Sequence, residues 1–242
     1  MSIDIALNVQ GIYKHYSNRL VLDNVSLSVN SGEVFGLIGL NGIGKTTLIK
    51  IMMDLLGSDK GSISFFGISS NTHKSRENVF YLPEKFSPSP FLKGWEFLSM
   101  VLNYYNKKYS DVDAKDLCNR FGLSNDFLYK RISSYSKGMG QKLGLISVFI
   151  SGAKLLMLDE PMSGLDPSAR IMVKREIKKH CSNGGTVFFS SHILSDIDEV
   201  CNRMSVLHNN SVMFTGTPSE LLSLHNTNNM ETAFLREIGE SV

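Results

Sequence analysis

The spacing of hydrophobic residues in the first part of the chain predicts strands. Residues 6–16 and 20–29 have the spacing of two strands, with a slip at Asp23-Asn24 that indicates a bulge or a turn. Residues 34–38 form a short continuous apolar run, which is long enough for a buried strand. An antiparallel β element is therefore expected ahead of a central strand.

A helical period follows this strand. The apolar positions recur at i, i+3, i+4 and i+7, at Leu48, Ile51, Met52 and Leu55. We expect the helix to begin near Lys45 and to end at Gly57.

The middle of the chain changes character at a proline-rich stretch. Strands are predicted at 62–66 and 79–82, and three prolines within 83–90 predict an extended, helix-free link. Residues 91–151 carry only helix signals, in apolar stripes that are typical of core packing. The link is therefore a predicted boundary between two subdomains.

The last third of the chain returns to alternating strands and helices. Buried strands are predicted at 155–158 and 186–190, and a hairpin is predicted over Asn209-Asn210. Thr217 and Pro218 begin a short helix. The tail from Ser223 is polar and is expected to be loosely held.

Composition and charge limit the kinds of protein that this chain can be. The 242 residues are 42% hydrophobic and 20% charged, which is typical of a globular protein, and the net charge of +2 gives no reason to expect a nucleic-acid partner. Three cysteines, far apart in the sequence, indicate free thiols in a reducing cytosol. The sequence lacks a signal-peptide pattern and any run of about eighteen apolar residues, so we expect another chain to provide any membrane span.

Residues Gly39 to Thr46 fit the pattern G-x-x-x-x-G-K-[ST]. Glycines let several backbone N–H groups approach phosphate oxygens, and the helix that follows points its positive end at the same oxygens. Lys45 would contact the β- and γ-phosphates and the Thr46 hydroxyl would bind Mg²⁺. The motif predicts a nucleotide site but does not separate kinases, GTPases, helicases and transport ATPases.

Three further candidate groups follow predicted strands. Asp159 and Glu160 end the strand at 155–158, where Asp159 is suited to hold Mg²⁺ and Glu160 to polarise an attacking water. His192 follows the strand at 186–190, and we expect it at the same sheet edge. Glu84 follows another strand, where its carboxylate could reach a metal or a water.

Two candidates have an ordinary structural alternative. Tyr16 is suited to stack on an adenine ring, or to pack as a strand aromatic in a small β layer. Ser136 opens a glycine-bearing helix, which makes either a second anion site or a simple N-cap.

Taken together, these motifs resemble the nucleotide-binding subunit of an ABC transporter over nearly the whole chain. The matching segments are the Walker A motif (Gly39 to Thr46), the Walker B motif (Leu155 to Glu160), the D-loop (Ser163 to Asp166), the switch histidine (His192) and the adenine-stacking aromatic (Tyr16). Two motifs depart from the common pattern: Glu84 stands for the Q-loop glutamine, and the signature L-S-G-G-Q reads Tyr135-Ser136-Lys137-Gly138-Met139. Both departures are similar to bacterial export-type ABC ATPases.

The resemblance implies an α/β fold: a P-loop NTPase core with an N-terminal antiparallel β subdomain and an inserted α-helical subdomain. A single domain over 1–242 is expected, with 1–85 and 152–225 as the core, 86–151 as the helical subdomain and 226–242 as the tail. It also implies ATP hydrolysis with Mg²⁺, by a head-to-tail dimer in which the signature of one subunit covers the ATP of the other.

The resemblance implies roles for individual residues as well. Glu160 orients or deprotonates the attacking water, while His192 and Lys45 contact phosphate; these three are the catalytic candidates. The nucleotide-binding candidates are Tyr16, Gly39, Asn41, Gly42, Gly44, Lys45, Thr46, Thr47, Ser136, Gly138 and Asp166. The metal-binding candidates are Thr46, Asp159 and Glu84.

The implied partners are integral membrane permease subunits and a second ATPase subunit, either identical or a paralogue, at the cytoplasmic face of the membrane. A different class of function is a soluble ABC ATPase that drives assembly or translation. Several such proteins carry two cassettes or a coiled-coil insertion, and this chain has neither. A GTPase is disfavoured because Asn106-Lys107-Lys108-Tyr109 does not complete the guanine motif N-K-x-D. The cargo is not encoded in these motifs.

Overall fold

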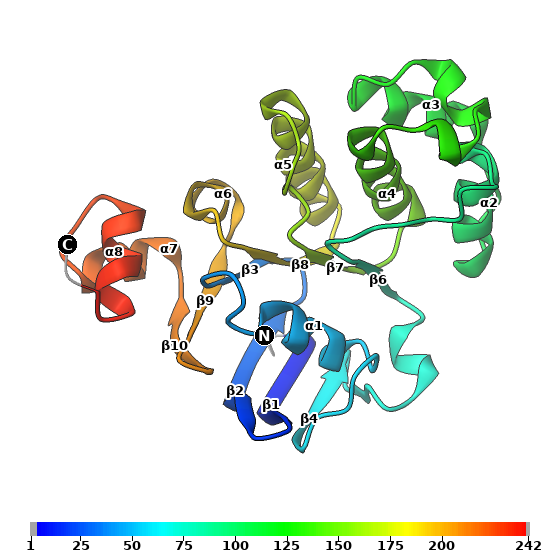
Figure 1. Ribbon diagram of the computed structural model, residues 1–242. Coiled ribbons are helices and arrows are strands. Elements are labelled where there is room, and N and C mark those ends of the chain that lie inside the picture. Colours follow the sequence, from blue (N-terminus) through cyan, green and yellow to red (C-terminus); the bar gives the residue numbers. More distant parts are fainter. Residues whose placement is uncertain (1–3, 241–242) are drawn as a thin grey trace.

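The computed structural model describes residues 4–240, which contain two β-sheets (Figure 1). One sheet has four strands in the order β2-β1-β4-β5, and the other has six in the order β10-β9-β3-β8-β7-β6. Helices cover the larger sheet, so the predicted α/β class is confirmed.

The four-stranded sheet is antiparallel and comes from the N-terminal part of the chain. Its strands are β1 (Ile5–Tyr16), β2 (Arg19–Asn30), β4 (Lys60–Phe65) and β5 (Ile68–Ser69). The register of β1 against β2 shifts on either side of Ile12, and Asn24 has a positive φ of 50°. The bulge expected at Asp23-Asn24 is therefore present.

The six-stranded sheet is parallel except for one edge strand. Its strands are β3 (Val34–Ile38), β6 (Val79–Leu82), β7 (Leu155–Asp159), β8 (Thr186–Ser191), β9 (Arg203–His208) and the antiparallel β10 (Ser211–Gly216). Every residue of β3, β7 and β8 is buried, because layers cover both faces of these central strands. Asn209 and Asn210 both have positive φ, which confirms the predicted hairpin turn between β9 and β10.

The two faces of the six-stranded sheet have different covers. The helix α1 (Lys45–Met52) lies between this sheet and the antiparallel sheet, in one hydrophobic core. On the opposite face, a second core is formed with α4 (Lys137–Ser151), α5 (Pro167–Ser182) and α6 (Leu194–Val200). The helices α2 (Gly94–Tyr104) and α3 (Asp111–Arg120) lie beside α4 at one end of the molecule.

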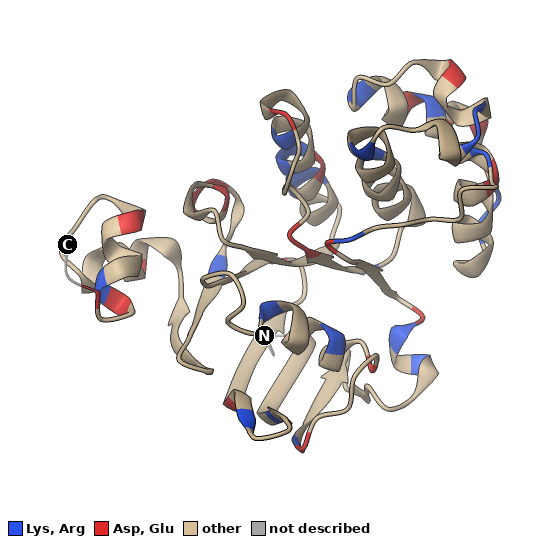
Figure 2. Cartoon of the chain, in the orientation of Figure 1, with Lys and Arg blue, Asp and Glu red and all other residues tan. Residues whose placement is uncertain are grey.

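Ion pairs connect neighbouring helices on the face of the six-stranded sheet opposite α1. Lys and Arg lie among Asp and Glu on α5 and on the group α2 to α4 (Figure 2). The guanidinium of Arg120 in α3 lies 2.6 Å from the Glu176 carboxylate in α5, and Arg170 in α5 lies 2.8 Å from Asp196 in α6. These contacts link neighbouring helices that meet the core through their apolar faces.

One prediction about a helix is wrong. The helix α1 ends at Met52, well before Gly57, because Asp54 takes a left-handed φ of 58° and turns the chain. Leu55 is consequently 63% exposed and does not join the apolar face. Within the segment that carries helix signals, residues 125–129 and 132–134 form short 3₁₀ helices.

The prediction of a loosely held tail is also wrong. The helices α7 (Pro218–Leu224) and α8 (Met230–Glu237) pack against each other at the C-terminal end. Met230, Ala233 and Phe234 are buried, and the imidazole of His225 lies 2.7 Å from the Glu237 carboxylate. Residues 218–238 thus belong to the packed structure.

The proline-rich link is free of helix, as predicted, over residues 83–90. The proposed subdomain boundaries at residues 85, 151 and 225 stay a prediction. Within residues 4–240, no helix is both long and apolar enough to cross a bilayer.

Candidate nucleotide site

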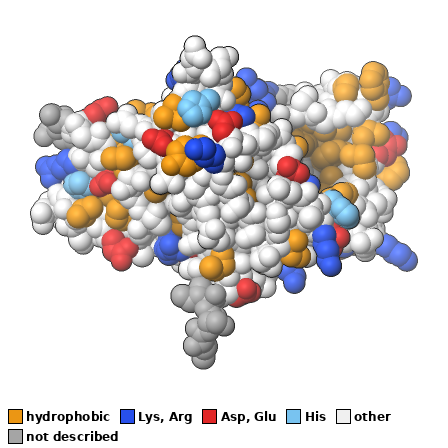
Figure 3. All heavy atoms as spheres, turned by 90° about the horizontal axis from the view of Figure 1, so that it is seen from below, with side chains coloured by type: hydrophobic (Ala, Val, Ile, Leu, Met, Phe, Trp, Pro, Cys, Tyr) orange, Lys and Arg blue, Asp and Glu red, His pale blue; other side chains and the backbone are white. Residues whose placement is uncertain are grey.

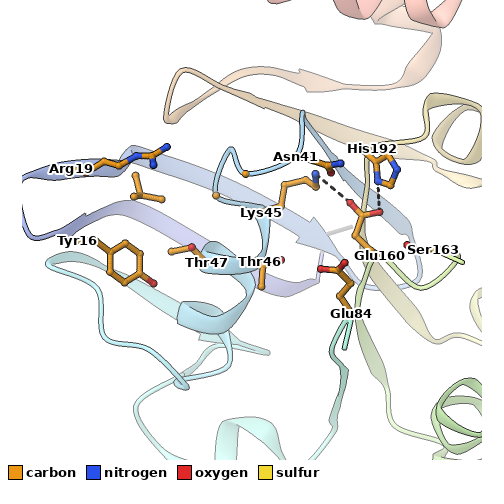
Figure 4. A pocket seen from close by; sticks show the side chains of 13 residues that line it. Tyr16, Arg19, Asn41, Lys45, Thr46, Thr47, Glu84, Glu160, Ser163 and His192 are labelled. Atoms are coloured by element: carbon orange, nitrogen blue, oxygen red, sulfur yellow. Dashed lines mark hydrogen bonds and ion pairs between the residues drawn. The ribbon is translucent and has the colours of Figure 1, made fainter. Parts of the chain in front are cut away.

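A cavity of about 710 Å³ lies at the carboxyl edge of the six-stranded sheet (Figure 4). This is the edge at which open α/β sheets bind ligands, because the loops after parallel strands converge there. The lining residues are Tyr16, Arg19, Val21, Asn41, Gly42, Gly44, Lys45, Thr46, Thr47, Glu84, Glu160, Ser163 and His192. Most of the predicted site residues therefore meet around one cavity.

The glycine loop between β3 and α1 has the backbone that its sequence predicts. Gly42 and Gly44 have φ of 78° and 116°, and a Cβ on Gly39 would lie 2.5 Å from the Leu207 carbonyl oxygen. No side chain within residues 4–240 caps the N-terminus of α1. The first N–H groups of the helix and its positive dipole end are therefore available to an anion.

Lys45, Glu160 and His192 form a row of contacts along the cavity floor (Figure 4). The Lys45 Nζ donates to the Gly39 carbonyl oxygen at 2.7 Å and lies 3.3 Å from the Glu160 Oε1. The Glu160 Oε2 lies 2.9 Å from the His192 Nδ1. The buried carboxylate is therefore held between a cation and an imidazole, which come from the start of α1 and from the end of β8 respectively.

Ser190 joins the ends of β7 and β8 beneath this row. Its hydroxyl donates to the Asp159 Oδ1 at 2.6 Å and accepts from the Glu160 backbone N–H at 3.0 Å. Glu160 itself has a positive φ of 49°, which is uncommon for a non-glycine residue. One buried hydroxyl thus fixes the turn that aims Glu160 into the cavity. Nothing in the sequence singled out this serine.

The environment of Asp159 suits a cation. Burial raises the pKa of its carboxyl, while the neighbouring Ser190 and Thr46 hydroxyls act in the opposite direction. The Asp159 Oδ2 is buried and has no hydrogen-bond partner within residues 4–240. No group of three His, Cys, Asp or Glu side chains among these residues is arranged to hold a metal alone. The donor set matches Mg²⁺, which binds through one or two carboxylates together with substrate phosphates.

The opposite end of the cavity is formed by Tyr16 and Arg19, of which Arg19 was not predicted (Figure 4). Tyr16 is 48% exposed, and Val21, which was not predicted either, also lines the cavity. Tyr16 and Arg19 are directly paired across the turn between β1 and β2. The predicted strand pair, taken with its register, would have located Arg19 beside Tyr16.

Five predicted residues are not part of this cavity lining. Ser136 is exposed at the start of α4, where its hydroxyl accepts from the Met139 backbone N–H at 3.2 Å, and Gly138 follows in the first turn. Asp166 caps α5 and lies 3.5 Å from the Lys142 ammonium of α4. Gly39 and Asp159 stand behind the lining, in contact with Lys45 and Ser190 respectively.

Comparisons with known proteins agree with this geometry. The family model described as "ABC transporter" matches residues 22–163. A solved structure of the ATP-binding subunit of an ABC transporter superposes with a TM-score of 0.88 at 28% identity, over 96% of this chain and 99% of that chain.

Curated relatives carry similar descriptions. An ABC transporter ATP-binding protein of Synechocystis is 35% identical over 83% of this chain and 58% of its own length. The Nod factor export ATP-binding protein I of Bradyrhizobium diazoefficiens is 27% identical over 92% of this chain and 74% of its own length. The chain thus spans less than two thirds of some relatives that it matches. Since the family model covers more than half of the chain and the fold agrees along nearly all of it, the chain belongs to the family of ABC transporter ATP-binding proteins.

Proposed function

We propose that this chain binds and hydrolyses ATP as the motor subunit of an export-type ABC transporter. The observation that carries the proposal is the row Lys45–Glu160–His192 at the N-terminus of α1. It combines a cation for phosphate, a carboxylate for water and an imidazole in one cavity. This is the set of groups that phosphoryl transfer to water needs.

The two ends of the cavity suit the two ends of ATP. The exposed ring of Tyr16 offers a stacking surface for the base, and the N–H groups of the glycine loop offer donors for the phosphates. The volume of about 710 Å³ is within the usual range for small-molecule sites. ATP bound in this direction brings its γ-phosphate to Lys45, Glu160 and His192.

Hydrolysis then depends on positioning and charge. Glu160 orients a water for in-line attack and accepts its proton, and His192 contacts the γ-phosphate from the next strand end. Lys45 stabilises the charge that develops on the phosphate oxygens. To do this, the Lys45 ammonium shifts from the Glu160 carboxylate toward the nucleotide.

Asp159, Thr46 and Glu84 would hold Mg²⁺ at the same end of the cavity. The unpartnered Asp159 Oδ2 and the Thr46 hydroxyl support this assignment. When bound, Mg²⁺ supplies charge neutralisation on the β- and γ-phosphates. Glu84 is the variant Q-loop residue, and its carboxylate faces the cavity next to Thr46.

A second ATPase subunit completes the site in this proposal. Ser136 and Gly138 are remote from the cavity of their own chain but present a helix N-terminus on the surface. In a head-to-tail dimer this terminus closes on the γ-phosphate held by the partner subunit. Asp166, between α4 and α5, would lie at the same interface.

A membrane permease is the proposed recipient of the motion, which puts this chain at the cytoplasmic face of the membrane. Phe91, Met100 and Tyr104, in or just before α2, are more than half exposed. Figure 3 shows apolar side chains gathered on that side of the molecule. The export direction is supported by the two motif departures and by the similarity to a Nod factor export ATP-binding protein.

The variant Glu160→Gln tests the assignment of the base. We expect its ATP hydrolysis to fall at least about 100-fold, because the amide cannot accept the proton of the attacking water. Binding of ATP is retained in this variant, and ATP-dependent dimers accumulate because the closed state no longer turns over. Hydrolysis is followed by phosphate release, and dimers by light scattering.

Two further variants make this test specific. Lys45→Ala should weaken nucleotide binding itself, and Glu231→Gln, an exposed carboxylate on α8, should behave as the unmodified chain. Near-normal ATP hydrolysis by Glu160→Gln would contradict the assignment of Glu160 as the base.

A further inference from the structure

We propose that the Tyr81 hydroxyl is a positioning group of the cation site, which hydrogen-bonds to the hydration shell of Mg²⁺ beside Asp159. The inference rests on the proposed function, because it presupposes that this chain binds nucleotide together with Mg²⁺. It adds a residue of β6 that belongs to none of the motifs described above.

Strand register brings Tyr81 to the cation site. Tyr81 in β6 pairs with Met157 in β7, and Asp159 lies two residues farther along β7. Side chains two residues apart point to the same face of a sheet. Tyr81 and Met157 both belong to the core on the α1 face, so the Asp159 carboxylate and the Tyr81 ring share the face on which α1 starts.

The Tyr81 hydroxyl is buried without a partner. Within residues 4–240 its oxygen accepts and donates no hydrogen bond, and the same holds for the Asp159 Oδ2. A buried hydroxyl that lacks a partner carries its full desolvation penalty, which phenylalanine at this position would avoid. Both atoms lie on the α1 face of neighbouring strands, where one water of a bound cation would give each of them a partner.

The charges around Tyr81 identify the kind of group. A tyrosine hydroxyl keeps its proton at neutral pH in any case; burial, together with the carboxylates of Asp159 and Glu84, raises the pKa of Tyr81 further, to about 12. A neutral phenol is a poor direct ligand, but it accepts a hydrogen bond from a bound water and donates its own proton to a carboxylate. Mg²⁺ usually keeps several waters in protein sites, which gives the phenol its partner.

The variant Tyr81→Phe removes only the hydroxyl and tests the proposal. ADP binding is measured by calorimetry, first in EDTA and then across a Mg²⁺ titration. We expect the affinity in EDTA to be unchanged. The Mg²⁺ concentration that gives half of the maximal change in ADP affinity should rise by about 10- to 100-fold. A loss of this size is typical when a residue that orients the ligands of a metal is removed.

Tyr105→Phe is the matched control. The Tyr105 hydroxyl donates to the Val79 carbonyl oxygen at 2.8 Å, so it is a partly buried phenol that contacts the same strand away from the cation site. Its loss should lower the melting temperature of the nucleotide-free chain and leave the Mg²⁺ dependence unchanged. Tyr81→Phe should leave that melting temperature equal or higher, because it removes a hydroxyl without a partner.

The results of these measurements distinguish a failure of the role of Tyr81 from a failure of the proposed function. If Tyr81→Phe shows the Mg²⁺ dependence of the unmodified chain, or loses stability as Tyr105→Phe does, Tyr81 is structural and the inference fails. If the unmodified chain itself binds no nucleotide, or binds it without any effect of Mg²⁺, the proposed function fails instead.

Discussion

Ser190 shows how a single side chain can hold two candidate site residues in place. Its hydroxyl holds the Asp159 carboxylate and the Glu160 backbone N–H at once. We predict that Ser190→Ala lowers the free energy of unfolding by about 1–3 kcal/mol, because it leaves both buried groups without this partner. Denaturant unfolding measures the loss, and hydrolysis should fall as well because Glu160 is no longer aimed.

Ser182→Ala is the control for this prediction. Ser182 is an exposed residue at the end of α5, whose hydroxyl donates to the Lys179 carbonyl oxygen. A surface change of this kind should stay within about 0.5 kcal/mol. Equal stability of the two variants would mean that the Ser190 hydroxyl does not hold the turn at Glu160.

At the same scale, the residues that the sequence predicted share one property. Lys45, Asp159 and His192 each stand in a motif or at the end of a strongly apolar strand, where strand topology alone brings them together. Ser190 lies inside such a strand and gives no signal of its own. Arg19 needed the register across the first hairpin, which the hydrophobic pattern does not determine at a bulge.

At the scale of elements, α8 is the feature that the sequence concealed. The segment around it is polar, yet Met230, Ala233 and Phe234 have the spacing i, i+3, i+4 of a helix face, and Asn229 caps it. Apolar residues are few among the polar residues of this tail, so the helix face does not stand out in the sequence. The end of α1 was missed for a related reason, since the left-handed turn at Asp54 interrupts an apolar period that continues in sequence to Leu55.

The packing of α8 leads to an element-scale prediction. Phe234→Ala removes a side chain that is 6% exposed and should lower the free energy of unfolding by about 3–5 kcal/mol, through lost burial and the cavity left behind. The measurement is chemical unfolding monitored by circular dichroism. Leu224→Ala, at a residue that is 59% exposed, should change little. A small change in the free energy of unfolding for Phe234→Ala would mean that the tail is loosely held after all.

At the scale of the whole molecule, the proposed dimer makes a prediction about mixtures. Lys45→Ala disables the P-loop half of a site, and Gly138→Arg blocks the α4 half, where a Cβ added to Gly138 meets no atom of its own chain within 4 Å. Either variant alone should hydrolyse little ATP. A mixture should recover activity, because each mixed dimer combines one intact P-loop with one intact α4 terminus.

The result of the mixing experiment also tests the partners. No recovery would mean that a second copy of this chain does not complete the site, which leaves a paralogue as the other half. An active mixed assembly extracted from membranes with detergent is expected to contain an integral membrane protein. Its absence would favour a non-transport role for the same ATPase.

The short connection between α4 and β7 has a mechanical consequence. Only Gly152, Ala153 and Lys154 separate α4, which Ser136 caps, from the strand that ends at Asp159, and Gly152 has a left-handed φ of 64°. A helix of 15 residues is about 22 Å long, so a tilt of about 10° at Gly152 would carry its far end through an arc of about 4 Å. A small rotation at Gly152, beside the sheet, would thus displace the N-terminus of α4 by a distance comparable to the length of a hydrogen bond to phosphate.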